Sequence, residues 1–283
     1  MPELPEVEVL VRHLRPAVRN RTVRRVHVHR AKVLGRTSPA RLKRQLIRAR
    51  FTGVIRRGKY LLFKLDQPSA QQPLTLVAHL GMTGRIYLAR RSTPLPKHAA
   101  VVLELDRDNF IFEDTRYFGR FTLDPNALPV LGPEPMSAEF TTELFARNLQ
   151  RSRQPIKVRL LDQTLVAGIG NIYASEALFR ARISPRLPSC KLNRREVSRL
   201  RNAIRRVLAE AIRFGSTVPL SYSGETRDGL FYFGRSPEAP DYYEERLRVY
   251  DRAGQPCPHC ARPIRQIVQA ARSTFYCPNC QRR

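Results

Sequence analysis

The sequence predicts an α+β fold, with β-strands in the first half of the chain and helices in the second. Short stretches of alternating apolar and polar residues recur between residues 23 and 113, which favours an antiparallel sandwich or barrel. Beyond residue 137, apolar residues recur every three or four positions, as on one face of a helix. The 283 residues are enough for two domains, or for one domain with a small appendage.

A helix is predicted at the start of the chain, over residues 5–14. Its apolar face consists of Val7, Leu10, Val11 and Leu14. Pro5 suits the first turn, where a missing N–H costs nothing, and Pro16 is expected to end the helix. We expect the β-rich half of the chain to pack against its apolar face.

Six strands are predicted in that half, at residues 23–29, 51–55, 60–65, 74–80, 101–105 and 110–113. Two loops between them have functional features. Residues 56–59 place three cations round a glycine, and residues 79–84 form a glycine-bracketed tip that carries Met82. A solvated basic turn and a packed methionine are the alternative interpretations of these loops, and each is the more common one.

Four prolines between residues 124 and 136 indicate a linker, and helices are predicted beyond it. These helices cover residues 137–149, 156–165 and 172–180, followed by a longer one. Asn193 and Glu196 form a capping box at the start of the longer helix. The break at residues 168–171 suits either a packing turn or a helix start whose N–H groups bind phosphate. Residues 214–248 lack periodicity, as expected of a long functional or mobile loop.

Two Cys-x-x-Cys pairs near the C-terminus, separated by 16 residues, have the spacing of a tetrahedral zinc site. The four cysteines are Cys257, Cys260, Cys277 and Cys280. Because four thiolates leave no open coordination position, the predicted Zn²⁺ ion is structural. Residues 264–268 and 274–276 alternate like two strands, which predicts a zinc-bound β-hairpin with Arg272 and Ser273 near its tip.

The charge predicts a polyanionic partner. Lys and Arg number 51 against 24 Asp and Glu, for a formal net charge of +27, and the cations are spread along the whole chain. Nucleic acid is the first candidate and a membrane surface the second. No stretch of about 18 apolar residues exists, and the acidic, proline-containing start is unlike a signal peptide. We therefore expect a cytoplasmic protein, associated with the nucleoid if it is bacterial.

The first residues suggest nucleophilic catalysis. Removal of Met1 would leave the secondary amine of Pro2 as the N-terminus. An α-amino group has a pKa of roughly 8, and such an amine can attack a sugar C1′ to form a Schiff base. Glu3 is adjacent and could move protons. Met-Pro also begins proteins in which the proline only starts a helix.

Together these motifs resemble the formamidopyrimidine-DNA glycosylases, bacterial enzymes that excise oxidised purines. The resemblance rests on segments that follow one another in the family's order, at residues 1–8, 57–62, 79–84, 114–119, 168–174 and 272–281. No single segment is decisive, but their order and the four-cysteine spacing are specific together. The resemblance implies an N-terminal antiparallel β-sandwich with a leading helix. It also implies a C-terminal helical domain with a helix-two-turn-helix and a zinc β-hairpin finger that has four cysteine ligands.

The resemblance further implies how the chain is divided and what it does. Residues 2–124 would form the catalytic domain, 125–136 a linker, 137–248 the helical domain with a lesion-recognition loop, and 249–283 the zinc finger. The implied activity is base-excision repair. The enzyme would remove 8-oxoguanine and formamidopyrimidines from duplex DNA and cleave the abasic strand by β,δ-elimination. We expect a monomer, because no apolar stripe is left over for a partner subunit.

Site residues follow from the same resemblance. Pro2 would be the nucleophile and Glu3 the proton donor. Lys59 would assist β-elimination and Arg272 the second, δ-elimination. The gap left by the displaced nucleotide would be filled by Met82, Arg116 and Phe118. The phosphate contacts would come from His98, Arg153, Lys157 and Asn171.

Some positions depart from the family's pattern. Tyr117 stands where a second arginine is common, and Thr115 where a proline is frequent. Gly224–Glu245 does not resemble the usual lesion-covering loop. An endonuclease VIII-like enzyme for oxidised pyrimidines therefore stays open as an alternative. A non-catalytic DNA-binding relative is a third possibility, against which the retained Pro2 and Lys59 argue.

Overall fold

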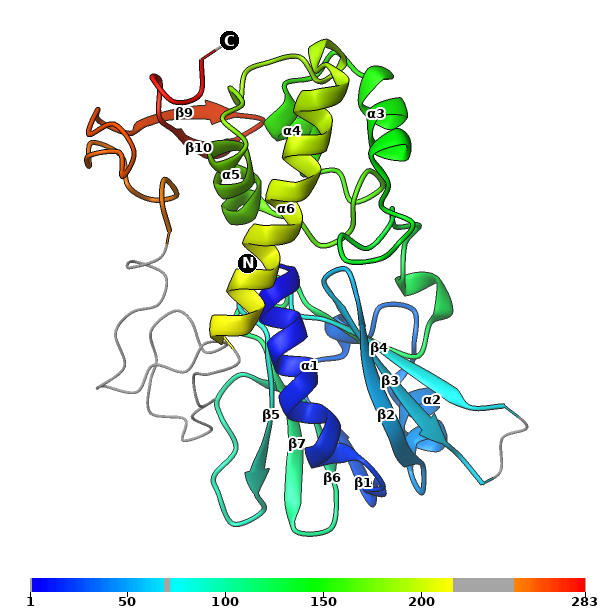
Figure 1. The fold of residues 1–283 in the computed structure, drawn as a ribbon. Coiled ribbons are helices and arrows are strands. Elements are labelled where there is room, and N and C mark those ends of the chain that lie inside the picture. Colours follow the sequence, from blue (N-terminus) through cyan, green and yellow to red (C-terminus); the bar gives the residue numbers. More distant parts are fainter. Residues whose placement is uncertain (1, 69–71, 216–246, 283) are drawn as a thin grey trace. The chain divides into compact units, whose positions relative to one another are not determined.

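The computed structural model describes residues 2–68, 72–215 and 247–282 (Figure 1). They form two compact units. The β unit contains residues 2 and 6–129, and the helical unit contains residues 3–5, 130–215 and 247–282. The predicted lesion-covering loop, Gly224–Glu245, lies outside the described residues, and the domain boundaries given above stay predictions. No helix in the described parts of the chain is both long enough and apolar enough to cross a membrane.

The β unit contains two four-stranded antiparallel sheets. One has the order β1-β6-β7-β5, formed by Arg25–Val28, Ala99–Glu104, Asp108–Glu113 and Arg85–Arg90. The other has the order β2-β3-β4-β8, formed by Arg50–Arg57, Tyr60–Asp66, Leu74–His79 and Arg120–Thr122. The strand pairs β2–β3, β3–β4 and β6–β7 are neighbours along the chain, as short connections favour.

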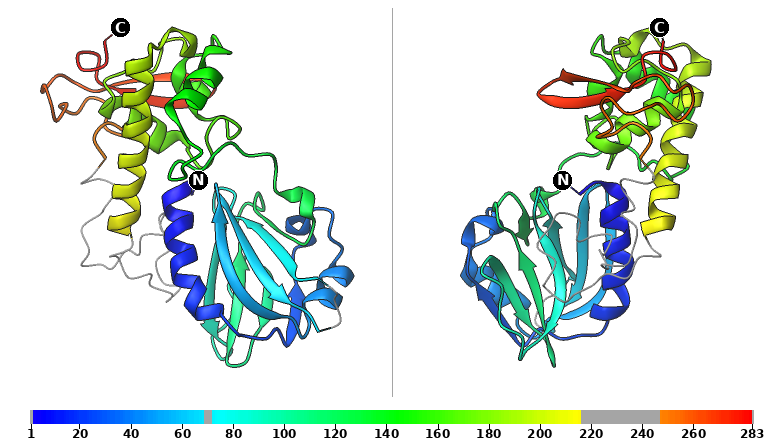
Figure 2. Two further views of the ribbon diagram at one scale, coloured as in Figure 1. Left: turned by 45° about the vertical axis from the view of Figure 1, so that its right-hand side comes forward. Right: turned by 90° about the vertical axis from the view of Figure 1, so that its left-hand side faces the viewer.

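Phenylalanine rings join the two sheets into a sandwich. Phe110 of β7 lies 5.8 Å from Phe51 and 5.3 Å from Phe63 between ring centroids, and both partners belong to the other sheet. Phe112 stacks on Phe121 of β8 at 5.4 Å. All five rings are fully buried. The predicted sandwich is therefore confirmed, and Figure 2 shows its two layers from two further directions.

Helix α1 covers Leu4–Val18, so it continues past Pro16, which was predicted to end it. In the last turn of a helix the missing N–H of a proline costs only one backbone bond. Two contacts fix α1 to strand β2: Arg56 donates to Glu8 at 2.8 Å and Arg15 donates to the Val54 carbonyl at 3.2 Å. Burial opposes ionisation of Glu8, but the Arg56 and Arg12 guanidiniums outweigh it and lower its pKa.

The β unit also contains elements that were not predicted. Helix α2 (Pro39–Leu46) begins after Ser38, whose hydroxyl accepts the Arg41 N–H at 3.2 Å. Strands β5 and β8 were also missed. Two short 3₁₀ turns, η1 and η2, cover Ala31–Leu34 and Pro125–Ala127.

The helical unit is built from α3 (Thr142–Gln150), α4 (Ile156–Leu160), α5 (Asn171–Arg180) and α6 (Arg194–Gly215), with a 3₁₀ turn η3 (Ser189–Lys191). Helix α3 is capped by Thr141 and begins five residues later than predicted, and α4 ends five residues earlier than predicted. The capping box is confirmed, because Asn193 and Glu196 exchange two bonds of 2.9 Å. The apolar faces of α3, α5 and α6 enclose one core, which Leu4 joins.

The C-terminal hairpin consists of β9 (Arg265–Gln269) and β10 (Arg272–Tyr276). It packs on α5, since Phe179 shares a buried cluster with Ile264 and Phe275. Glu176 of α5 is buried and accepts the backbone N–H groups of residues 248, 249 and 250 at 2.9–3.1 Å. The chain that enters the hairpin is thereby fixed to α5.

Candidate active site

The carboxylate of Glu3 lies at the N-terminus of α5, within the helical unit. It accepts the backbone N–H of Gly170 at 2.6 Å, of Ile172 at 2.8 Å and of Tyr173 at 3.4 Å. The side chain is only 2% exposed. N–H groups at a helix start carry partial positive charge, so this arrangement suits an ionised carboxylate. The helix start that could have bound a phosphate is therefore occupied by the chain's own Glu3.

Gly170 is required here because of the space that Glu3 occupies. A Cβ atom at residue 170 would lie 2.3 Å from the Glu3 carboxyl carbon and 2.5 Å from one of its oxygens. The backbone is held as well, since the Leu4 N–H donates to the Gly168 carbonyl at 3.0 Å. Both the side chain of Glu3 and the backbone beside it are thus fixed by the turn that precedes α5.

A second polar group lies at the same end of α5. Lys157 donates to the Asn171 side-chain oxygen and, at 3.4 Å, to the Ser273 carbonyl. The Asn171 amide donates to that same carbonyl at 2.9 Å. Burial lowers the pKa of Lys157 to about 8, with Arg272 acting in the same direction and Glu3 in the opposite one.

These contacts place Arg272 close to the predicted phosphate ligands. Arg272 is the first residue of β10 and is exposed, directly after the turn formed by Ala270 and Ala271. Its neighbour Ser273 bonds to both Lys157 and Asn171. Arg153, by contrast, is exposed in the segment between α3 and α4, and no contact described for it joins this group.

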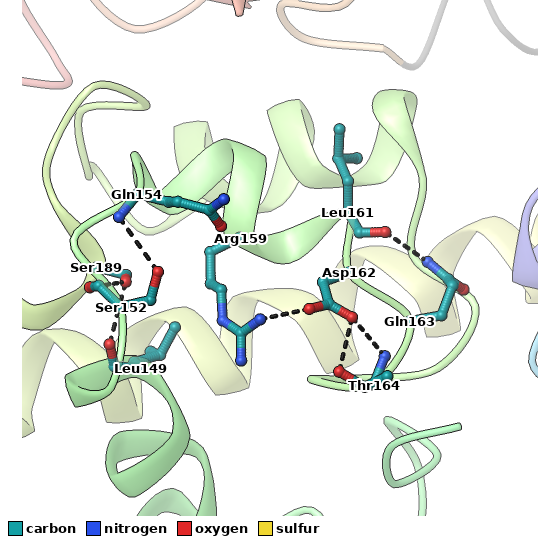
Figure 3. A network of polar contacts seen from close by, with 9 residues as sticks. All are labelled: Leu149, Ser152, Gln154, Arg159, Leu161, Asp162, Gln163, Thr164 and Ser189. Atoms are coloured by element: carbon teal, nitrogen blue, oxygen red, sulfur yellow. Dashed lines mark hydrogen bonds and ion pairs between the residues drawn. The ribbon is translucent and has the colours of Figure 1, made fainter. Parts of the chain in front are cut away.

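The segment between α4 and α5 is held by polar contacts of its own (Figure 3). Asp162 accepts the backbone N–H of Thr164 at 2.8 Å and its hydroxyl at 2.7 Å, and it forms an ion pair with Arg159. A side chain that binds the backbone two residues ahead competes with helix continuation, which explains why α4 stops at Leu160. Gln163 then bonds to the Leu161 carbonyl at 3.0 Å.

In the β unit, the predicted intercalating residues lie on two neighbouring loops. Met82 is 42% exposed and Phe118 is 52% exposed. The Arg116 guanidinium lies 5.1 Å from the centre of the Phe118 ring. The loops approach closely at Gly81, whose φ is +60° and where a Cβ atom would lie 2.7 Å from the Gly119 nitrogen. Each loop therefore carries a large, partly exposed apolar side chain at its tip.

Asp114 joins these two loops, a role that the sequence did not reveal. Its fully buried carboxylate accepts the Thr83 hydroxyl at 2.8 Å from one loop. From its own loop it accepts the backbone N–H of Gly119 at 2.8 Å and of Arg116 at 3.1 Å. The only available signal was its position at the start of the 114–119 motif, which does not say what the carboxylate binds.

Lys59 precedes β3 and is buried, and His79 ends the neighbouring strand β4. Burial, together with the Lys59 and Arg120 charges, lowers the pKa of His79 to about 4. The neutral imidazole accepts the Gly81 N–H through Nδ1 at 3.1 Å. Pro2 also belongs to this unit and is buried.

His98 lies beside Tyr117, the residue that departs from the family's pattern. The ring nitrogen Nδ1 is 3.4 Å from the Tyr117 hydroxyl, which also accepts from Arg30 at 3.2 Å. Tyr117 has a φ of +54°, which is uncommon for a residue with a large side chain. The tyrosine therefore holds a backbone turn and connects the Arg30 guanidinium with the His98 imidazole.

The four cysteines lie together, with all Sγ atoms within 4.8 Å of one another. The Sγ distance is 3.8 Å between Cys257 and Cys280 and 3.5 Å between Cys260 and Cys277. Tetrahedral Zn²⁺ with Zn–S bonds of about 2.3 Å requires sulfur separations of about 3.8 Å. The four thiolates therefore fit Zn²⁺, and His259 is not part of the group.

Three family models match the chain in succession. Residues 1–121 match the formamidopyrimidine-DNA glycosylase N-terminal domain and residues 131–221 its H2TH domain. Residues 254–283 match a zinc finger found in FPG and IleRS. The matches define a class of DNA-repair glycosylases with a β domain, a helical domain and a zinc finger, and they confirm the zinc prediction.

Individual relatives narrow the class. A formamidopyrimidine-DNA glycosylase from Symbiobacterium thermophilum is 44% identical over 290 residues, which covers 99% of this chain and 89% of the relative. One from Thermus thermophilus is 43% identical, with 99% and 98% covered. The structure of Lactococcus lactis Fpg (MutM) with N7-benzyl-Fapy-dG DNA has a TM-score of 0.86 at 31% identity, with both chains covered completely. The chain belongs to the formamidopyrimidine-DNA glycosylase family.

Removal of the zinc ion should affect the hairpin. We expect one Zn²⁺ per chain by elemental analysis, and we expect Cys257→Ala to lose it because three thiolates bind zinc far more weakly than four. Cys190→Ala is the matched control and should keep the ion. A Cys257→Ala protein that still contains one Zn²⁺ per chain would contradict the four-cysteine site.

Loss of the Asp114 charge should destabilise the β unit. In Asp114→Asn, the side-chain NH2 must face a backbone N–H or the Thr83 hydroxyl, so a donor is left unpaired at a cost of about 1–3 kcal/mol. Urea unfolding measures this change. Asp106→Asn is the control, because Asp106 is half exposed and forms only surface ion pairs, worth about 0–1 kcal/mol. Equal losses in the two variants would show that Asp114 does not hold the loops.

Proposed function

We propose that this protein is a base-excision repair enzyme that removes 8-oxoguanine and formamidopyrimidines from duplex DNA and then cleaves the strand. The observation that carries the proposal is the Glu3 carboxylate, directly after Pro2 and held by three N–H groups of the α5 N-terminus. A protein that only bound DNA would not need a buried carboxylate beside its N-terminal amine. Family membership supports the same activity.

The lesion class is supported by the relatives. Solved relatives include Fpg (MutM) complexes with DNA containing Fapy-dG, carbocyclic 8-oxo-G or an abasic site. These ligands are two oxidised purines and the product of their removal. Purine lesions are therefore the first substrates to test, and oxidised pyrimidines serve as the comparison.

The amine of Pro2 begins the reaction once Met1 has been removed. An ionised Glu3 can accept the proton of the Pro2 ammonium, which leaves the nitrogen nucleophilic. That nitrogen bonds to C1′ while the bond between C1′ and the base breaks. The nitrogen then gives its remaining proton to the departing base, and the C1′–O4′ bond opens, which gives an iminium. Glu3, now protonated, delivers a proton to O4′.

The iminium makes strand cleavage possible because it acidifies the C2′ proton. Loss of this proton expels the 3′ phosphate, and loss of a C4′ proton then expels the 5′ phosphate. We assign Lys59 to the first elimination and Arg272 to the second. A cation beside each leaving phosphate stabilises the charge that develops on it. Hydrolysis of the remaining Schiff base returns Pro2 to its amine form.

Exposure of the lesion is assigned to the two loops joined by Asp114. A base must leave the stack before C1′ can be attacked, at a cost of a few kcal/mol. Met82 and Phe118 would enter the vacated space, which offsets part of this cost. Arg116 would donate hydrogen bonds to the base that has lost its partner.

The remaining roles concern the phosphates and the zinc. His98, Arg153, Lys157 and Asn171 are assigned to phosphates, and Lys157 also donates to the Asn171 side chain. When bound, Zn²⁺ holds the hairpin that presents Arg272, and it takes no part in bond cleavage. Because the protein has a net charge of +27, we place it in the cytoplasm, bound to nucleoid DNA. We expect it to act as a monomer.

Borohydride trapping tests the proposed function. The protein is mixed with a duplex that contains 8-oxoguanine opposite cytosine, and the reduced adduct is digested for mass spectrometry. We expect a cross-link on Pro2, about 100-fold or more slower in Glu3→Gln because proton transfer is lost. Glu139→Gln, at an exposed position, should react like the wild type.

Each other outcome of this experiment has a definite meaning. A cross-link with abasic DNA but not with 8-oxoguanine DNA would support the proposed lyase activity and would contradict 8-oxoguanine as the excised lesion. Strong preference for thymine glycol would favour the endonuclease VIII-like alternative. Binding without any cross-link would mean that the protein is not catalytic.

The lowered pKa of Lys157 makes DNA affinity depend on pH. Lys157 loses its charge as the pH rises through about 8, so a bound phosphate loses a favourable interaction. We expect wild-type affinity to fall about 3- to 10-fold more between pH 7 and pH 9 than that of Lys157→Met. Fluorescence anisotropy on uncleavable abasic-analogue DNA measures this. Equal pH dependence in both proteins would contradict a charged Lys157 near the DNA.

A further inference from the structure

We propose that Gln163 is a positioning residue for Glu3, and that it acts through the turn that precedes α5. This inference rests on the proposed function, because it concerns the same carboxylate. The amide of Gln163 contacts the backbone on both sides of this turn. Its role is to set where the N–H groups that hold Glu3 are located.

The Gln163 side-chain amide both donates and accepts hydrogen bonds. Nε2 donates to the Leu161 carbonyl at 3.0 Å and to the Ile169 carbonyl at 2.8 Å. Oε1 accepts the Gly168 N–H at 2.9 Å. One side chain thereby fixes two consecutive residues, 168 and 169, to the end of α4.

Those two residues lead directly to Glu3. The Gly168 carbonyl accepts the Leu4 N–H at 3.0 Å, which fixes the backbone next to Glu3. Gly170, the next residue after Ile169, donates to the Glu3 carboxylate at 2.6 Å. A shift of residues 168–169 would therefore move both the backbone and the carboxylate of the proposed proton-transfer residue.

Gln163 is itself held in place by its neighbours. The flanking residues Asp162 and Thr164 bond to each other, and Arg159 pairs with Asp162 (Figure 3). The Gln163 backbone carbonyl accepts the Gly132 N–H at 2.8 Å. Because the backbone of Gln163 is held, its side-chain amide can hold residues 168 and 169 in a fixed position. A catalytic group requires rigid support of this kind.

The chemistry of the three bonds requires an amide. The two carbonyls need a donor and the Gly168 N–H needs an acceptor, at a single place in the turn. Leucine has a similar shape but offers neither. An ionised glutamate offers only acceptors and would face two carbonyl oxygens, whereas a protonated glutamate restores one donor and one acceptor.

The first measurement is the single-turnover excision rate of Gln163→Leu on 8-oxoguanine DNA. We expect a fall of about 10- to 100-fold, because small displacements of a catalytic group cost rate in this range. DNA affinity should stay within about twofold, since no phosphate ligand is changed. Gln150→Leu, the same change at an exposed position of α3, should keep the wild-type rate.

The second measurement is the pH profile of Gln163→Glu. Its excision rate, divided by the wild-type rate at the same pH, should rise at least about fivefold as the pH is lowered from about 8 to about 5, where a buried glutamate becomes protonated. Protonation lets the side chain donate to the Ile169 carbonyl again. A purely structural loss would give a ratio that does not change with pH.

The two measurements decide the proposal even if one variant folds poorly. A Gln163→Leu rate within about twofold of the wild type would overturn it, as would a Gln163→Glu ratio independent of pH. If Gln163→Leu does not fold, the proposal is decided by how the Gln163→Glu excision rate, divided by the wild-type rate, changes with pH. Failure of the proposed function is distinguishable, because in that case the wild-type protein itself forms no borohydride adduct with 8-oxoguanine DNA.

Discussion

The bond between the Glu3 carboxylate and the N-terminus of α5 is the interaction on which the site depends. A buried carboxylate is costly unless it is hydrogen-bonded, and here three backbone N–H groups satisfy it. Backbone donors at a helix start cannot rotate away as lysine or arginine side chains can. The orientation of Glu3 is therefore set by the fold before any DNA is bound.

Asp114 repeats the same principle in the β unit. There too a buried carboxylate accepts backbone N–H groups, with one hydroxyl in addition. The chain has 51 basic and 24 acidic side chains. Several of the acidic side chains are buried, where they hold loops in place by accepting hydrogen bonds. Glu176, which holds the chain that enters the hairpin, is a third example. Because these three acids are buried, they do not neutralise cations on the surface.

Much of the fold was predictable because its signals are local. The capping box at Asn193 and the alternating strands depend on residues a few positions apart, and the two cysteine pairs are separated by only 16 residues. Elements with weaker signals were missed or misplaced. Helix α2 has only two buried apolar residues, and its start is marked solely by Ser38 and Pro39. The early end of α4 depends on a side-chain contact of Asp162 that periodicity does not report.

The site was predictable in its residue types but not in its contacts. Glu3 and Gly170 are 167 positions apart, and nothing in either segment indicates that one accepts a bond from the other. The contacts of Asp114 and Gln163 are equally hidden, because a carboxylate or an amide in a loop has many potential partners. The motifs 1–8 and 168–174 thus appeared as two separate signals, although Glu3 and Leu4 of the first bond to the second.

Residues 3–5 belong to the helical unit, whereas the remainder of α1 from residue 6 belongs to the β unit. The first residues of the chain therefore depend on parts that are synthesised much later. A ribosome that has released the whole β unit has made Glu3 but not the helix start whose N–H groups hold its carboxylate. Glu3 therefore reaches its final position only after α5 has been synthesised and folded.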